Sequence, residues 1–93
     1  MTGTPPTDRL GELRREIDEI DAGIVALLDR RADAALNIGT YKSEAGMPSP
    51  LDAAREDAVI QHVQAIRRGP FPERDLIRLY RQIMAVCRGL QEK

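Results

Sequence analysis

The chain has 93 residues, with 14 basic and 15 acidic side chains and a net charge of −1. This balance argues against a nucleic-acid-binding protein, because that class normally carries a basic excess. A single cysteine and a single histidine exclude an intrachain disulfide and argue against a structural zinc site. No stretch approaches the roughly 18 apolar residues of a membrane span, so we expect a soluble, cytoplasmic protein.

The chain length supports one small domain, whose core is marginal without disulfides, a metal or a partner subunit. Oligomerisation is the remaining way to enlarge that core. Residues 1–7 are rich in Thr and Pro and lack the apolar segment of a signal peptide. We therefore expect a flexible N-terminus over residues 1–7 and a single domain over residues 8–93.

The first predicted helix runs from about residue 8 to about residue 44. Gly46, Pro48 and Pro50 follow it as a stop signal. Apolar residues recur along it at alternating spacings of three and four, which is typical of a coiled-coil seam: Leu10, Leu13, Ile17, Ile20, Ile24, Leu27, Ala34 and Ile38. The helix would be about 55 Å long, whereas a compact globule of this size is only about 32 Å across. The seam therefore predicts a homodimer with paired long helices.

Two shorter helices are predicted after it, which makes the fold all-α with three helices per chain. Ser49 would be the N-cap of the second helix, in a capping box with Asp52. The second helix would end at residues 67–70, and the third would start near Pro72 and run nearly to the C-terminus. Their apolar stripes are Val59, Ile60, Val63 and Ile66 in the second, and Leu76, Leu79 or Tyr80, Ile83, Cys87 and Leu90 in the third.

Arg31 occupies a position that the seam of the first helix reserves for an apolar side chain. A buried guanidinium without a partner is costly, so something anionic should meet it. Lys42 lies eleven residues on, about 20° around the helix and roughly 16 Å along it, and therefore shares this face. Alternatively, Arg31 pairs with Asp29 or Asp33 at the surface and Lys42 pairs with Glu44.

Arg14 lies about 100° around the same helix from Arg31 and roughly 25 Å away. One helix cannot direct both side chains at a single small ligand. The partner helix of an antiparallel dimer could deliver Arg14 from its other end. Alternatively, Arg14 is a solvated charge beside Arg15.

The shorter helices carry further polar candidates. Asp52, Arg55 and Glu56 share a face, and Glu56 heads an apolar stripe and should point inward. The alternative is a carboxylate cluster at the helix start, with Arg55 as its ion-pair partner. Cys87 is expected as a small buried residue rather than a nucleophile. Gln91 lies one turn later, either at the edge of the core or as a frayed terminal residue.

Five segments, in order, resemble the all-helical chorismate mutases. Their patterns are L-R-x-x-I-D-x-I/L-D, I/L-x-x-L-L-x-x-R, I/V-G-x-x-K, D-x-x-R-E and S-x-x-L-Q, which match residues 13–21, 24–31, 38–42, 52–56 and 87–91. The resemblance covers about residues 10–91. It departs from the family where Cys87, a weaker hydrogen-bonding group, stands at the position that is often Ser.

The resemblance implies an intertwined homodimer in which Arg14 acts in the partner's pocket. It implies the Claisen rearrangement of chorismate to prephenate in phenylalanine and tyrosine biosynthesis, which needs no metal or other cofactor. The arginines would hold the substrate carboxylates. Lys42 and Gln91 would bind the ether oxygen, and Glu56 and Asp52 would bind the ring hydroxyl. The implied substrate-binding residues are Arg14, Arg31, Lys42, Asp52, Arg55, Glu56, Cys87 and Gln91, with Lys42, Gln91 and Arg31 catalytic.

Other functions remain open on the same fold. One is a 4-amino-4-deoxychorismate mutase, and another is an isochorismate pyruvate-lyase, although D-x-x-R-E favours the mutase. A different class is a non-catalytic helical dimer that regulates an enzyme of the shikimate pathway. Because some related mutases associate with the first enzyme of that pathway, such an association is a further hypothesis about partners.

Overall fold

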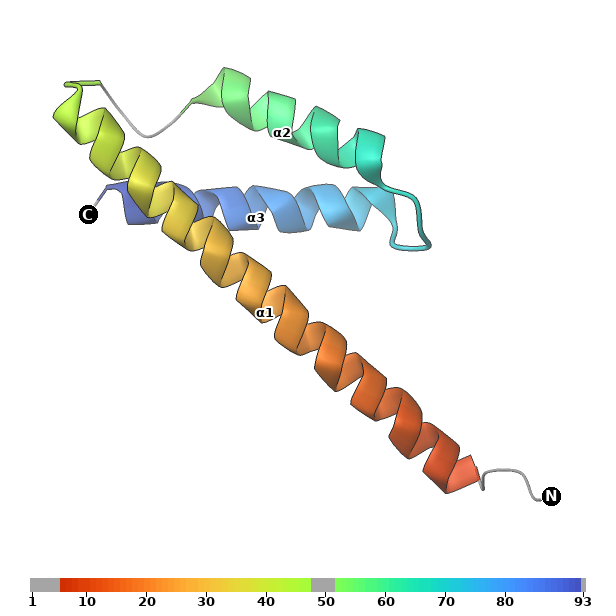
Figure 1. Cartoon of the computed structure of the whole chain (residues 1–93). Coiled ribbons are helices and arrows are strands. Elements are labelled where there is room, and N and C mark those ends of the chain that lie inside the picture. Colours follow the sequence, from red (N-terminus) through yellow and green to blue (C-terminus); the bar gives the residue numbers. More distant parts are fainter. Residues whose placement is uncertain (1–5, 48–51, 93) are drawn as a thin grey trace. The chain divides into compact units, whose positions relative to one another are not determined.

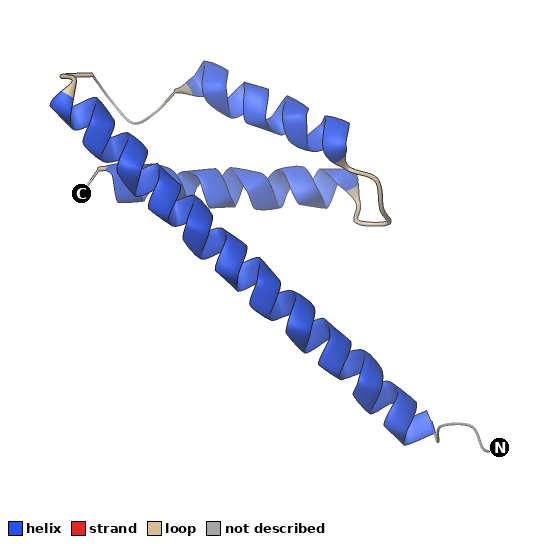
Figure 2. Ribbon diagram, in the orientation of Figure 1, coloured by secondary structure: helices blue, strands red, loops and turns tan. Residues whose placement is uncertain are grey.

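The computed structural model describes residues 6–47 and 52–92, and the regular structure in these ranges is entirely helical (Figures 1 and 2). Helix α1 spans Pro6–Glu44, α2 spans Ala53–Ile66 and α3 spans Glu73–Gln91. The prediction of three helices with a long first one is confirmed. The chain divides into two compact units, Met1–Arg31 and Ala32–Lys93. The predicted flexibility of residues 1–7 falls largely outside the described residues.

The first unit contains the N-terminal part of α1, and its predicted apolar seam is exposed. Six large side chains of this seam are between 41% and 59% exposed: Leu10, Leu13, Ile17, Ile20, Ile24 and Leu27. Scattered apolar side chains are normal on a protein surface, but a continuous stripe along one helix is typical of a surface that another chain covers.

The second unit contains the end of α1 and an antiparallel hairpin formed by α2 and α3, which pack together (Figure 1). The buried side chains are Ala35 of α1, Ile60 and Val63 of α2, and Met84 and Cys87 of α3. The expectation that Cys87 is a small buried residue is therefore confirmed. Tyr80 rather than Leu79 continues the stripe of α3, since Tyr80 is half-buried and Leu79 is exposed.

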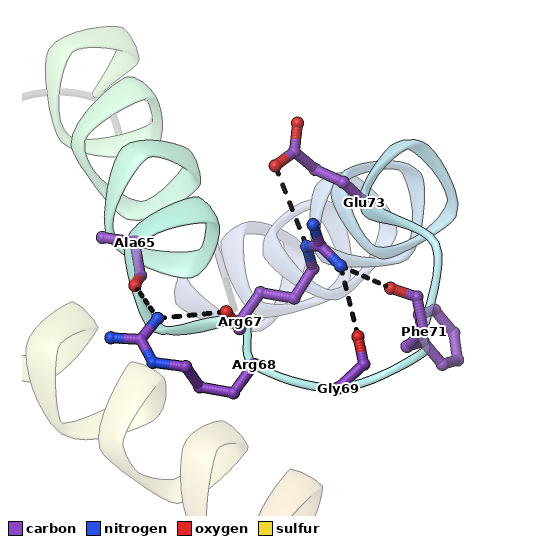
Figure 3. Close-up of polar contacts among 6 residues, drawn as sticks. All are labelled: Ala65, Arg67, Arg68, Gly69, Phe71 and Glu73. Carbon is purple, nitrogen blue, oxygen red and sulfur yellow. Dashed lines mark hydrogen bonds and ion pairs between the residues drawn. The ribbon is translucent and has the colours of Figure 1, made fainter.

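Two arginines fix the turn between α2 and α3 (Figure 3). The Arg67 guanidinium donates to the backbone carbonyls of Gly69 and Phe71, at 3.3 and 3.2 Å, and its Nε lies 3.8 Å from a carboxylate oxygen of Glu73. Arg68 donates to a carbonyl in the last turn of α2. Side-chain donors thus satisfy carbonyls that would otherwise have no partner at a helix end and in a tight loop.

The N-cap of α2 is Asp52, whose side chain accepts a hydrogen bond of 2.9 Å from the backbone N–H of Arg55. The predicted capping box starting at Ser49 is therefore wrong, although Ser49 itself lies outside the described residues. Asp52 alone satisfies a free N–H at the helix start, so the helix needs no earlier cap. The predicted start of the third helix near Pro72 is confirmed, because Pro72 is the N-cap of α3.

The end of α1 is fixed by Gly46, which has a φ of +68°. The N–H of Gly46 bonds to the carbonyl of Ser43 at 3.2 Å, and the N–H of Met47 bonds to the carbonyl of Lys42 at 2.8 Å. This pair of bonds is a Schellman motif, which requires a left-handed residue where glycine is favoured. The motif ends α1 within a turn of Lys42 and fixes the backbone there.

Gly39 allows α1 to approach the C-terminal turn of α3. A Cβ atom at Gly39 would lie 3.1 Å from the Cα of Gln91 and 3.3 Å from its carbonyl oxygen. Both are backbone atoms, so they cannot rotate away as a flexible side chain would. The small residue is therefore required by the distance between the two helices, and Gln91 is held against α1.

We expect Gly39→Ala to destabilise the protein. Overpacking costs about 1–3 kcal/mol, and the better helix propensity of alanine offsets about 1 kcal/mol of that. Gly89→Ala is the matched control, because a Cβ at Gly89 meets nothing within 4 Å. Urea unfolding of both variants tests the expectation, which fails if Gly39→Ala is as stable as Gly89→Ala.

Candidate active site

Lys42 lies on the packed face of α1. In the second unit, the less exposed positions of this helix are Ala32, Ala35, Gly39 and Lys42, at spacings of three, four and three. Such spacings place all four on one face. Lys42 lies one helical turn after Gly39, the residue that contacts Gln91. Lys42 forms no ion pair with a described residue. The alternative pairing of Lys42 with Glu44 is therefore absent from the described part of the chain.

Gln91 is half-buried, and its side-chain oxygen is buried without a hydrogen-bond partner among the described residues. Leaving such a group unpaired costs about 1–3 kcal/mol, and unpaired buried groups often have a functional reason. The interpretation of Gln91 as a frayed terminal residue is wrong, because Gln91 lies within α3 and is half-buried. Its backbone lies against α1 at Gly39. Gln91 also lines a cavity of about 430 Å³ together with Leu36, Gly39, Thr40, Ser43, Glu44, Leu90 and Glu92.

Glu56 of α2 is half-buried, in agreement with its place at the head of an apolar stripe. Its carboxylate accepts a hydrogen bond from the guanidinium of Arg88 in α3, with which it forms an ion pair. The alternative of Arg55 as the ion-pair partner is therefore wrong. The Arg55 side chain is exposed and forms no ion pair with a described residue.

Arg88 was not predicted as a site residue. It lies four residues after the buried Met84 and directly after the buried Cys87, so it stands at a core-facing position. A charged residue at such a position is the same signal that singled out Arg31 on the first helix. The spacing of α3 could have identified Arg88 in the same way.

Asp52 and Cys87 have roles within this chain that do not need a ligand. Asp52 is exposed and caps α2, so its side chain serves the backbone at the helix start. Cys87 is 7% exposed and belongs to the core of the second unit. Both residues therefore have a structural role, in addition to the contact with substrate that the resemblance predicts.

Arg14 and Arg31 belong to the first unit, whereas the other six predicted residues belong to the second. Arg14 is exposed, and Arg31 is half-buried. Within the second unit, the structure brings Gln91 to the face of α1 that ends in Lys42, and it joins Glu56 to α3 through Arg88. Glu56 and Arg88 therefore form one polar pair between α2 and α3, whereas Lys42 lies one turn from the contact with Gln91 and is not among the residues that line the cavity there.

Residues 6–47 and 52–92 contain no group of three or more His, Cys, Asp or Glu side chains placed to hold a metal ion. In the same ranges, no helix combines the length and the apolar character that crossing a membrane requires.

Comparison with known proteins identifies relatives over most of the chain. The sequence model of the family "Chorismate mutase type II" matches residues 13–92. Bifunctional chorismate mutase/prephenate dehydratases of Aquifex aeolicus and Neisseria gonorrhoeae are both 37% identical, over 92% and 84% of this chain. The chain spans only 25% and 21% of their lengths. A solved chorismate mutase (form II) from Thermus thermophilus superposes with a TM-score of 0.86 at 30% identity, covering 91% of this chain and 96% of that one.

We expect Asp52→Ala to lower the free energy of unfolding by about 1 kcal/mol, because the first turn of α2 loses its cap. Asp52→Asn retains a side-chain oxygen that can accept from the Arg55 N–H, and it should be nearly as stable as the wild type. Thermal unfolding of the two variants makes the comparison. Equal stability of the alanine and asparagine variants would show that the cap contributes nothing.

Proposed function

Because this chain is a chorismate mutase domain and belongs to the type II, all-helical family, we propose that it converts chorismate to prephenate in aromatic amino acid biosynthesis. The observation that carries the proposal is the packed face of α1, which ends in Lys42 one turn beyond the contact between Gly39 and Gln91. Among the described residues, the Lys42 ammonium has no ion-pair partner, so it is available to an anionic group, and the Gln91 side chain is partly buried with its oxygen unpaired.

The rearrangement breaks the ether C–O bond while a C–C bond forms, and negative charge grows on the ether oxygen. Donors fixed in place before the reaction stabilise this charge without reorganising, and one such donor contributes about 3–4 kcal/mol in comparable oxyanion sites. Lys42 supplies an ammonium group, and Gln91 supplies the N–H bonds of its amide. The Schellman motif and the contact at Gly39 hold the backbone of these two residues.

The substrate must also be held in a folded conformer with its two carboxylates fixed. Guanidinium groups suit this task, since they bind carboxylates in two-point contacts, and fixing a reactive conformer removes part of the activation entropy. Arg31 and Arg14 bind these carboxylates, and Arg55 at the start of α2 supports them. Glu56 and Asp52 accept from the ring hydroxyl, and Cys87 borders the substrate.

The family fold is an intertwined dimer, and we include a dimer of this chain in the proposal. The exposed stripe on the first unit of α1 supports it, because a second copy would cover those six apolar side chains. Arg14 then comes to each site from the partner. Three further points stay predictions: the domain limits 8–93, the cytoplasmic location and an association with the first shikimate-pathway enzyme. Activity on the 4-amino analogue of chorismate and isochorismate pyruvate-lyase activity also stay predictions.

Loss of chorismate absorbance on adding the purified protein tests the activity, and the Lys42→Ala variant tests the assignment of the site. We expect this variant to lose at least about 100-fold in kcat, because a donor to the ether oxygen is removed. Its unfolding transition should be unchanged. Arg30→Ala, which removes an exposed cation of the same helix, is the control and should keep full activity. Turnover by Lys42→Ala near the wild-type rate would refute the role of Lys42.

Mixing two inactive variants tests whether Arg14 acts in the partner's site. A dimer of one Arg14→Ala chain and one Lys42→Ala chain has one intact site if Arg14 is supplied in trans, and none if it acts within its own chain. Random exchange of subunits makes half of the dimers mixed, so about a quarter of wild-type activity should return. Light scattering before mixing checks the dimer. No recovery after exchange, or a stable monomer, would overturn the shared site.

A further inference from the structure

The ion pair between Arg88 and Glu56 joins α2 to α3 at partly buried side chains. The side chains of Arg88 and Glu56 are 30% and 25% exposed. Two other ion pairs of the described residues are more exposed and local, one within the first turns of α1 and one at the turn between α2 and α3. Charges that are partly withdrawn from water are screened less by salt and solvent, so the pair of Arg88 and Glu56 has the stronger electrostatic effect on its surroundings.

The contact with Arg88 occupies one oxygen of the Glu56 carboxylate, and no other described residue bonds to the second oxygen. Arg88 donates to Oε2 of Glu56, and an ionised carboxylate has two oxygens that can each accept hydrogen bonds. The other oxygen can therefore accept from a ligand while Oε2 is held. Because Arg88 cancels the charge of the carboxylate, the pair presents an oriented acceptor with little net charge.

We propose that Arg88 is a specificity-determining, positioning residue: it holds Glu56 as a charge-compensated acceptor, so that the site takes a neutral hydroxyl at that ring position of the substrate and discriminates against an ammonium group. This inference rests on the proposed function, in which Glu56 binds the ring hydroxyl. It goes beyond that function by naming a residue on another helix that determines which substituent Glu56 accepts.

The reason lies in the charge of the two substituents. An unpaired carboxylate attracts an ammonium group more strongly than a hydroxyl, because the first contact is between full charges. A guanidinium beside the carboxylate repels the same ammonium and removes most of that advantage. A hydroxyl keeps its hydrogen bond to the second oxygen in either case. Arg88 therefore acts mainly by excluding the wrong substrate, which is a common basis of specificity.

The test compares kcat and KM for chorismate and for 4-amino-4-deoxychorismate in four proteins. These are the wild type, Arg88→Gln, Arg88→Lys and the control Arg81→Gln, which removes an exposed arginine two turns earlier on α3. We expect the wild type to prefer chorismate. In Arg88→Gln, the ratio of kcat/KM values should shift toward the amine by about tenfold or more, with most of the change in KM. Arg88→Lys should keep the preference, and Arg81→Gln should match the wild type.

If the ion pair between Arg88 and Glu56 only stabilised the packing of α2 on α3, Arg88→Gln would lower the stability of the protein without changing its preference between the two substrates. Thermal unfolding of each variant is therefore measured beside the kinetics, and an unchanged ratio in a folded Arg88→Gln overturns the inference. If that variant does not fold, the wild type and Arg88→Lys decide, because a preference of either for the amine overturns it. A wild type without turnover of chorismate overturns the proposed function and this inference with it, whereas an active wild type with a constant ratio overturns only this inference.

Discussion

The contact between Gly39 and Gln91 is the constraint on which the candidate site depends. A helix carries its side chains outward, and two helices normally stand about 8–10 Å apart when side chains separate them. At Gly39 there is no side chain, so the backbone of α3 lies directly against α1. The last turn of α3 is thereby brought within one helical turn of Lys42, and α1 ends just beyond it in the Schellman motif. The glycine itself carries no functional group, but it determines how closely the candidate residue Gln91 approaches α1.

The second unit places polar groups where packing alone would favour apolar ones. Lys42 ends a face that includes the buried Ala35, Gln91 has a buried oxygen without a hydrogen bond to any described residue, and Glu56 meets Arg88 between two helices. Each arrangement costs free energy relative to a well-packed apolar side chain. Small domains have little stability to lose, so such positions are informative about function. In this domain they coincide with the segments that match the chorismate mutase patterns.

Much of this could be predicted from the sequence, because helix periodicity is a local property. The spacing of apolar residues predicted the three helices, the burial of Ile60, Val63 and Cys87, and the inward position of Glu56. The partner of Glu56 could not be predicted in this way. Arg55 is the neighbour of Glu56 in the sequence, whereas Arg88 lies on another helix. Only the packing of α2 on α3 shows that Arg88 is the ion-pair partner of Glu56. The sequence also does not distinguish Ser49 from Asp52 as the N-cap of α2, because both residue types cap helices well and helix boundaries are poorly specified by local sequence.

The exposed seam of α1 bears on how so short a chain could build the proposed site. A rearrangement that moves no proton to the protein needs only charges and donors in fixed places, and these can be spread over several helices. One copy of this chain leaves six large apolar side chains of α1 exposed while it builds Lys42, Gln91, Glu56 and Arg88 into the other unit. Pairing the long helices of two copies would bury that stripe and lengthen the shared core. It would also make the dimer itself the means by which a distant arginine on the same helix reaches the site.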